Sequence, residues 1–174
     1  DSLCSSSGYG MLVDGAADLR YAGKTIEEVS AWTDKMRHRV HHQFFSTDLK
    51  YFRRSGRMSG ATATVASILN ICPILRLNDE GRIIAYDKVR GKRNAINFIL
   101  HKMEVHAKDG IDYTGKVFIS HSNVIEDAKA IKRAIEERFR RINGEVRIYN
   151  IGTIIASHTG PGTVAVFFFG DERE

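Results

Sequence analysis

The segment 51–60 (YFRRSGRMSG) is the part of the chain best suited to hold an anion. It places three arginines and two glycines behind an aromatic pair, directly ahead of a long apolar run. Glycine lets backbone amides approach a bound oxygen, and a guanidinium such as that of Arg57 supplies a charge-assisted fork of hydrogen bonds. The segment predicts a site for an anionic head group beside an apolar pocket. The alternative is a solvated basic turn.

Two later segments have similar chemistry. The segment 88–93 (KVRGKR) lies between an expected strand and an expected helix, where free amides and the helix dipole favour an anion. In the segment 158–162 (HTGPG), a rigid turn is expected to present His158 at the end of a sheet. A histidine there can donate to a carboxylate or acyl phosphate and titrates near neutral pH. A structural turn histidine is the alternative.

Composition places the chain among ordinary globular proteins. Its 174 residues are 43% hydrophobic and 27% charged, which suits one domain, or one domain with an appendage. Cys4 and Cys72 have no paired spacing, so a reducing cytosol is favoured over a disulfide framework. No apolar run approaches the roughly 20 residues that a membrane span needs, so stable membrane insertion is not expected. The first residue, Asp1, suggests a fragment of a cytoplasmic protein.

The charge leaves several partner classes open. The net charge of +5 and the pI of 9.3 suit nucleic acid, an anionic membrane surface or a phosphorylated ligand. No finger, RNP-like or helix-turn-helix signature is visible, so nucleic acid is not the expected partner. A basic regulatory or nucleic-acid-binding module remains the alternative function.

Neither a metal site nor a hydrolase is expected. Five histidines lack the spacing and company of a metal site and are expected to be surface or packing residues; they are His41, His42, His101, His106 and His121. The run 120–122 (SHS) sets a serine beside a histidine, but adjacent residues in a strand point to opposite faces. No nucleophile elbow or supporting acid accompanies it.

Hydrophobic periodicity predicts an α+β fold with helices packed on a mixed sheet. Helices are expected over 10–21, from a capping box at Thr25 and Glu28 to Val40, around 48–52, and over 93–107 and 124–141. Strands are expected over 44–46, 74–77, 82–86, 117–120, 145–151, 153–157 and 163–169. The turn 78–81 (NDEG) predicts a β-hairpin between the second and third of these strands.

Six short motifs in one order resemble the DegV-type bacterial fatty-acid-binding proteins along the whole chain. They are DS at 1–2, SGYG at 7–10, the segment 51–60, NICPIL at 70–75, KVRG at 88–91 and HTGPG at 158–162. The resemblance implies a carrier and not an enzyme. Such a protein buries one long-chain fatty acid, needs no cofactor, and offers the carboxylate to a separate ATP-dependent fatty-acid kinase.

The resemblance also implies roles for particular residues. Arg57, Arg90 and His158, with the adjacent Thr159, are expected at the head group or on the kinase-facing surface. The pocket-lining candidates are Gly56, Ser59, Gly60, Ile68, Leu69, Ile71 and Gly160. The stretch 60–69 is small on one side and apolar on the other, so a thin alkyl chain could lie against it; close helix packing is the alternative.

The resemblance implies two regions. Family members begin with a parallel α/β segment that this chain lacks, so residues 1–45 are expected to be the helical end of that first domain. Residues 46–174 are expected to form a complete α+β second domain with a mixed, largely antiparallel sheet. Two departures from the family pattern are Ser55, where glycine is usual, and Cys72, where lysine is common.

Overall fold

The computed structural model describes residues 1–58 and 70–174. In these residues the strands form one sheet in the order β3-β2-β1-β6-β4-β5. The strands are β1 (Val40–Ser46), β2 (Ile71–Leu77), β3 (Ile83–Arg90), β4 (Phe118–His121), β5 (Arg147–Asn150) and β6 (Thr163–Phe169). Only the β4–β5 pair in this described part is parallel; the other neighbours are antiparallel. The predicted mixed, largely antiparallel α+β fold is confirmed.

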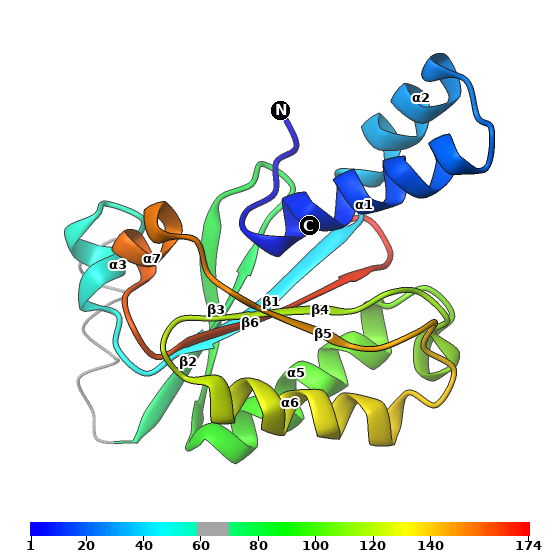
Figure 1. The fold of residues 1–174 in the computed structure, drawn as a ribbon. Coiled ribbons are helices and arrows are strands. Elements are labelled where there is room, and N and C mark those ends of the chain that lie inside the picture. The colour runs from blue at the N-terminus through cyan, green and yellow to red at the C-terminus, as the bar shows by residue number, and fades with distance from the viewer. Residues whose placement is uncertain (59–69) are drawn as a thin grey trace.

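The helices divide between the two faces of the sheet. They are α1 (Ser7–Tyr21), α2 (Ile26–Met36), α3 (Lys50–Arg54), α5 (Lys92–His106), α6 (Ile125–Arg138) and α7 (Thr153–Thr159), with a 3-10 turn, η2 (Gly110–Asp112). Figure 1 shows α5 and α6 side by side under one face, and α1, α3 and α7 above the other. None of the described helices is long and apolar enough to cross a membrane.

Strand β1 lies inside the sheet, between β2 and β6. Phe44 is in register with Leu75 on one side and with Ala165 on the other. Because successive side chains of a strand point to opposite faces, Phe44 joins the core beneath α1 and α3, and Phe45 joins the core beneath α5 and α6. The strand therefore contributes to both hydrophobic cores.

The start of β1 corrects a prediction. A helix reaching Val40 and a strand beginning at residue 44 were expected, but α2 ends at Met36 and β1 begins at Val40. Residues 41–43 (HHQ) are polar but buried, because the sheet continues on both sides of them. The Tyr86 hydroxyl donates to Gln43 Oε1 at 2.5 Å, so that side-chain oxygen has a partner inside the protein.

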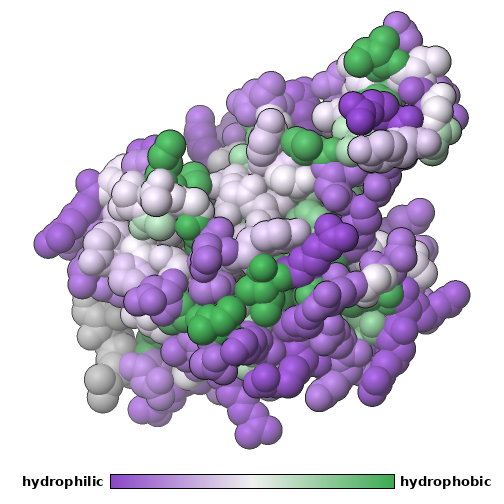
Figure 2. Space-filling model, viewed as in Figure 1, coloured by the Kyte–Doolittle hydropathy of each residue, from purple (hydrophilic) through white to green (hydrophobic). Residues whose placement is uncertain are grey.

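The hairpin of α1 and α2 projects away from the sheet (Figure 1). The predicted capping box is confirmed: Thr25 Oγ1 accepts from the Glu28 amide, and the Thr25 amide donates to the Glu28 carboxylate at 2.9 Å. The predicted apolar faces are only partly buried. Leu12 is buried, but Val13 is half exposed, and no residue of α2 is buried. Figure 2 accordingly shows hydrophobic surface, in green, on this projection.

The predicted hairpin of β2 and β3 is confirmed. The Asn78 amide donates to Arg82 O, and Asn78 Oδ1 accepts from the Arg82 amide at 2.8 Å, which closes the turn. Strand β3 continues to Arg90, so the first part of the basic segment 88–93 is strand and not loop. Gly91, with a positive φ of 79°, is the N-cap residue that precedes α5.

Two predictions near the C-terminus were wrong in detail. Residues 153–157, expected as a strand, form most of helix α7, so His158 lies in the last turn of a helix and not on a turn after a strand. Helix α6 ends at Arg138, three residues before the expected end. The other expected strands of this region are confirmed, with β5 shortened to Arg147–Asn150.

Close packing of α1 on the sheet gives a first test of this architecture. A Cβ added at Gly8 would lie 2.1 Å from His42 Nε2, whereas a Cβ at Gly10 meets nothing within 4 Å. Gly8→Ala should therefore lower the free energy of unfolding by about 1–3 kcal/mol, as overpacking of a core does. Gly10→Ala should instead raise it by roughly 0.5–1 kcal/mol, because alanine favours the helix. Urea denaturation measures both; equal effects would contradict the packing.

Candidate functional site

A cavity of about 560 Å³ lies on the face of the sheet opposite α5 and α6. Its floor includes Phe44 of β1 with Ala165 and Phe167 of β6. The β2–β3 hairpin contributes Leu77 and Ile83. Its volume falls in the range of small-molecule sites, and such sites combine a mainly apolar lining with a few polar groups.

Helix α7 forms an apolar wall of the cavity. Ile154, Ile155 and His158 of α7 line it, and His158 follows the two isoleucines by four and three residues, the spacing that places residues on one face of a helix. Ile151, two residues before α7, also lines the cavity. Ile154 is 75% exposed to solvent. The cavity is therefore open to solvent beside α7, where the side chain of Ile154 lines it.

Arg57 and His158, both predicted site residues, meet at the cavity. Arg57 Nη2 lies 3.4 Å from His158 Nε2, and both residues are part of the lining. Arg57 Nη1 also donates to Ser55 O at 2.8 Å, which orients the guanidinium. The Ser55 hydroxyl lies 3.3 Å from His158 O and can donate to it. The chain thus places a fixed positive charge and an imidazole together beside apolar surface.

Two glycines and a threonine shape the backbone around this pair. Gly56 lines the cavity with a φ of 70°, whereas Gly160, also a predicted lining residue, follows α7 with a φ of 72° and is not among the lining residues. A Cβ at Gly160 would lie 2.2 Å from the ring of Tyr51, so glycine allows α7 to pack against α3. Thr159 is buried, lines the cavity, and donates from Oγ1 to Ile155 O at 3.1 Å.

Other predicted site residues lie elsewhere or outside the described residues. Ile71 and Arg90 are in register as neighbours on β2 and β3, and neither is among the residues that line the cavity. Arg90 is exposed. Ser59, Gly60, Ile68 and Leu69 lie outside the described residues. The functional roles of all these residues stay predictions.

Sequence reasoning missed several polar lining residues. Ser5, Ser6, His42 and Thr163 contribute to the cavity wall. His42 lies two residues from Val40 and two from Phe44, so in a strand the three side chains point to the same face. This alternation is the sequence signal that could have placed His42 beside the cavity. The signal was lost because the polar run 41–43 was placed outside the strand.

His42 is buried and neutral in the fold. Its Nδ1 lies 2.9 Å from Val40 O, and its Nε2 accepts from the Ser5 amide at 3.1 Å, so the proton is assigned to Nδ1. Burial, with a smaller contribution from Arg173, lowers the pKa of His42 to about 3. His42 therefore ties the segment before α1 to β1 and presents no charge to the cavity.

Comparison with known proteins identifies the family. The family model described as "Uncharacterised protein, DegV family" matches residues 1–171. This chain belongs to the DegV family. A DegV domain-containing protein of Clostridium perfringens is 33% identical over 174 residues, which are 100% of this chain and 58% of that protein. The DegV chain described here thus spans less than two thirds of that relative's length.

Solved structures of DegV proteins have the same fold. A Thermus thermophilus DegV protein, described by its fatty acid binding, is 27% identical with a TM-score of 0.84; the match covers 98% of this chain and 60% of that one. The Streptococcus pneumoniae fatty acid kinase B3 protein, loaded with linoleic acid, has a TM-score of 0.86, covering 98% of this chain and 59% of that one. At 19% identity, the second likeness shows the fold alone.

The buried histidines of β1 predict a loss of stability on mild acidification. Burial lowers the pKa of His41 to about 4 and that of His42 to about 3, from 6.5. As the pH falls below 6.5, the unfolded chain takes up protons that the folded chain does not, so unfolding becomes more favourable. Each histidine should cost up to about 1.4 kcal/mol per pH unit across this window.

Urea denaturation between roughly pH 6.5 and 5, above the range where most carboxylates titrate, measures this slope. His42→Gln keeps a polar side chain but removes one titrating group, so the slope should become shallower. An unchanged slope in that variant would show that His42 is not buried in its neutral form.

Proposed function

We propose that this protein is a fatty-acid carrier that holds an acyl chain in the cavity and its carboxylate near Arg57 and His158. The observation that carries the proposal is the arginine–histidine pair, 3.4 Å apart, in the wall of a largely apolar cavity of about 560 Å³. Membership of the DegV family and the fatty acid binding described for the Thermus thermophilus protein support it.

The head-group end suits a carboxylate. Arg57 keeps guanidinium N–H groups beyond those that face Ser55 O and His158, and a guanidinium binds a carboxylate through parallel hydrogen bonds. His158 can add a donor, and the charge of Arg57 also suits a more negative acyl phosphate. Thr159, adjacent and buried, supports the backbone of α7 at this point.

The rest of the cavity suits an alkyl chain. Isoleucine side chains of α7 and of the β2–β3 hairpin face the floor made by Phe44 and Phe167. Apolar burial is worth about 0.8 kcal/mol per methylene, so a long chain gains affinity mainly from its length. The open side of the cavity lets such a chain enter.

The proposal includes a partner and no catalytic residue. In it, a separate ATP-dependent fatty-acid kinase phosphorylates the carboxylate while this protein holds the acyl chain. The kinase B3 name of the Streptococcus pneumoniae neighbour suggests this partner, although that likeness shows the fold alone. Residues 46–174 serve as the carrier domain in this proposal, together with the rest of β1 (Val40–Ser46), which lies between two of their strands. The helices before β1 are the end of a preceding domain, and Arg90 is on the kinase-facing surface.

Native mass spectrometry of the purified protein, followed by denaturing extraction and fatty-acid analysis, tests the proposal. We expect a mass excess of one fatty acid per chain that extraction releases. If neither the chain nor the full-length gene product retains or takes up linoleic acid, the carrier function is wrong. Oligonucleotide binding that weakens steeply with salt would instead favour a nucleic-acid-binding module.

Substitution of one arginine tests the head-group assignment. Arg57→Ala should weaken binding of linoleic acid about tenfold, because it removes a charge-assisted hydrogen bond to the carboxylate. This effect is at the low end for such a bond, since Arg57 is exposed to solvent. Arg53→Ala is the matched control, since Arg53 is also exposed, lies in α3, and is not part of the cavity lining. Titration of each variant measures affinity, and equal affinities would remove Arg57 from the head-group site.

A further inference from the structure

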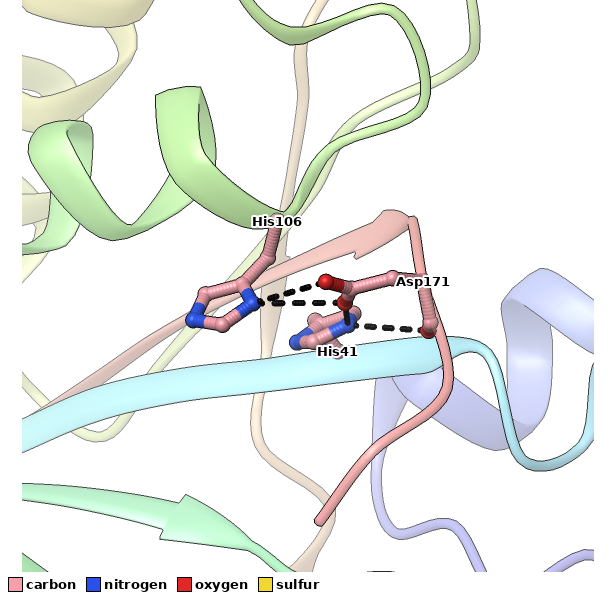
Figure 3. A group of neighbouring side chains, drawn as sticks. All are labelled: His41, His106 and Asp171. Carbon is pink, nitrogen blue, oxygen red and sulfur yellow. Dashed lines mark hydrogen bonds and ion pairs between the residues drawn. The ribbon is translucent and has the colours of Figure 1, made fainter.

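Folding brings two histidines and an aspartate together at one end of the sheet (Figure 3). His41 comes from β1, His106 is the last residue of α5, and Asp171 follows β6. His41 Nε2 lies 2.9 Å from Asp171 Oδ1, and His106 Nδ1 lies 3.2 Å from both carboxylate oxygens. One ligand atom from each residue lies within 4.8 Å of the other two.

Backbone hydrogen bonds hold these three segments at this spacing. The Gly170 amide donates to Arg39 O at 2.9 Å, and the Asp171 amide donates to His106 O at 3.0 Å. Gly170 also forms a bridge with Ala107, and a Cβ at Gly170 would lie 2.1 Å from His106 O. Main-chain hydrogen bonds therefore bring the three side chains together, independently of the contacts that these side chains make with one another.

Among the contacts of the described residues, neither Arg39 nor Arg173 pairs with the Asp171 carboxylate. Arg39 pairs with Glu172 at 2.7 Å, and Arg173 donates to Leu3 O and Arg37 O. His41 is 4% exposed, and its Nε2 lies 2.9 Å from Asp171 Oδ1. An imidazole nitrogen and a carboxylate oxygen are both groups that bind divalent metal ions.

We propose that His41, His106 and Asp171 form a binding site for a divalent transition-metal ion, Zn²⁺ in preference to Mg²⁺ or Ca²⁺. Two imidazole nitrogens and one carboxylate oxygen are typical ligands of zinc, whereas Mg²⁺ and Ca²⁺ take oxygen ligands. Tetrahedral Zn²⁺ with bonds of about 2.0–2.1 Å separates its ligand atoms by roughly 3.3–3.4 Å. The distances of 2.9 and 3.2 Å from the histidine nitrogens to Asp171 are close to this separation.

Coordination requires two adjustments. His41 Nε2 lies 3.2 Å from Asp171 O, where it donates, so metal binding needs the tautomer with the proton on Nδ1. The rings of His41 and His106 are stacked, with centroids 5.0 Å apart and planes inclined by 22°. A single ion lies in the plane of each imidazole that binds it, so one ring has to turn. The ring of His106 can do so, because 19% of its side chain is exposed and it ends a helix. His41, packed against Phe168, stays fixed.

The ion would fasten the end of α5 to the ends of β1 and β6. This site lies on the α5 side of β1, because His41 has the opposite strand parity to His42, which lines the cavity. The proposal is therefore independent of fatty-acid binding. It adds a metal site where the spacing of the histidines in the sequence predicts none.

Calorimetric titration with Zn²⁺, on tag-free protein dialysed against a chelator, tests the site. We expect one Zn²⁺ per chain, and His106→Gln should lower the affinity by at least roughly 100-fold, since even outer-shell substitutions cost 10–100-fold. His101→Gln is the matched control, because His101 is an exposed histidine of the same helix outside the cluster. It should bind Zn²⁺ as the unaltered protein does.

Co²⁺ gives a second measurement, since a tetrahedral nitrogen and oxygen site intensifies its visible absorption. These bands should appear with the unaltered protein and His101→Gln, and should be lost in His106→Gln and in Asp171→Asn, which keeps the size of the side chain. Far-UV circular dichroism confirms that each variant is folded. Absence of Zn²⁺ binding, or equal binding by His106→Gln and His101→Gln, would leave only a hydrogen-bonded contact and overturn the proposal.

Discussion

The structure depends on the two-sided pairing of β1. This strand is antiparallel to β2 and to β6, and all its residues are buried. Its alternation directs His42 and Phe44 to the cavity face and His41 and Phe45 to the face covered by α5 and α6. A slip of one residue would exchange the two sets. The lipid-binding proposal and the metal proposal therefore both require the same register.

Polar side chains on β1 help to specify that register. A buried imidazole or amide without a partner costs free energy, so a register that separates these groups from their partners is disfavoured. His42 is held between Ser5 and Val40, and Gln43 accepts from Tyr86. The partners come from the N-terminal segment, from β1 itself and from β3. The polar run thus connects β1 to distant parts of the chain.

Features set by local sequence could be predicted, and those set by distant contacts could not. The hairpin at 78–81 and the capping box at Thr25 arise from residues within a few positions of one another. The burial of residues 41–43 depends on strands far along the chain. Helix α7 is an intermediate case: its β-branched isoleucines favoured a strand, although His158 follows Ile154 and Ile155 by four and three residues, which is a helical spacing.

The same division applies to the candidate site. Composition identified Arg57 and His158 separately, but their 3.4 Å approach arises from the packing of α3 against α7. That packing requires Gly160 beside Tyr51 and is reinforced by the Ser55 hydroxyl at His158 O. Ser55 therefore adds a contact between the two basic elements. The packing of α3 against α7 sets the distance between Arg57 and His158, whereas side chains that can repack form the apolar wall of the cavity. Substitutions in that wall can therefore change the fit of an acyl chain without moving the head-group site.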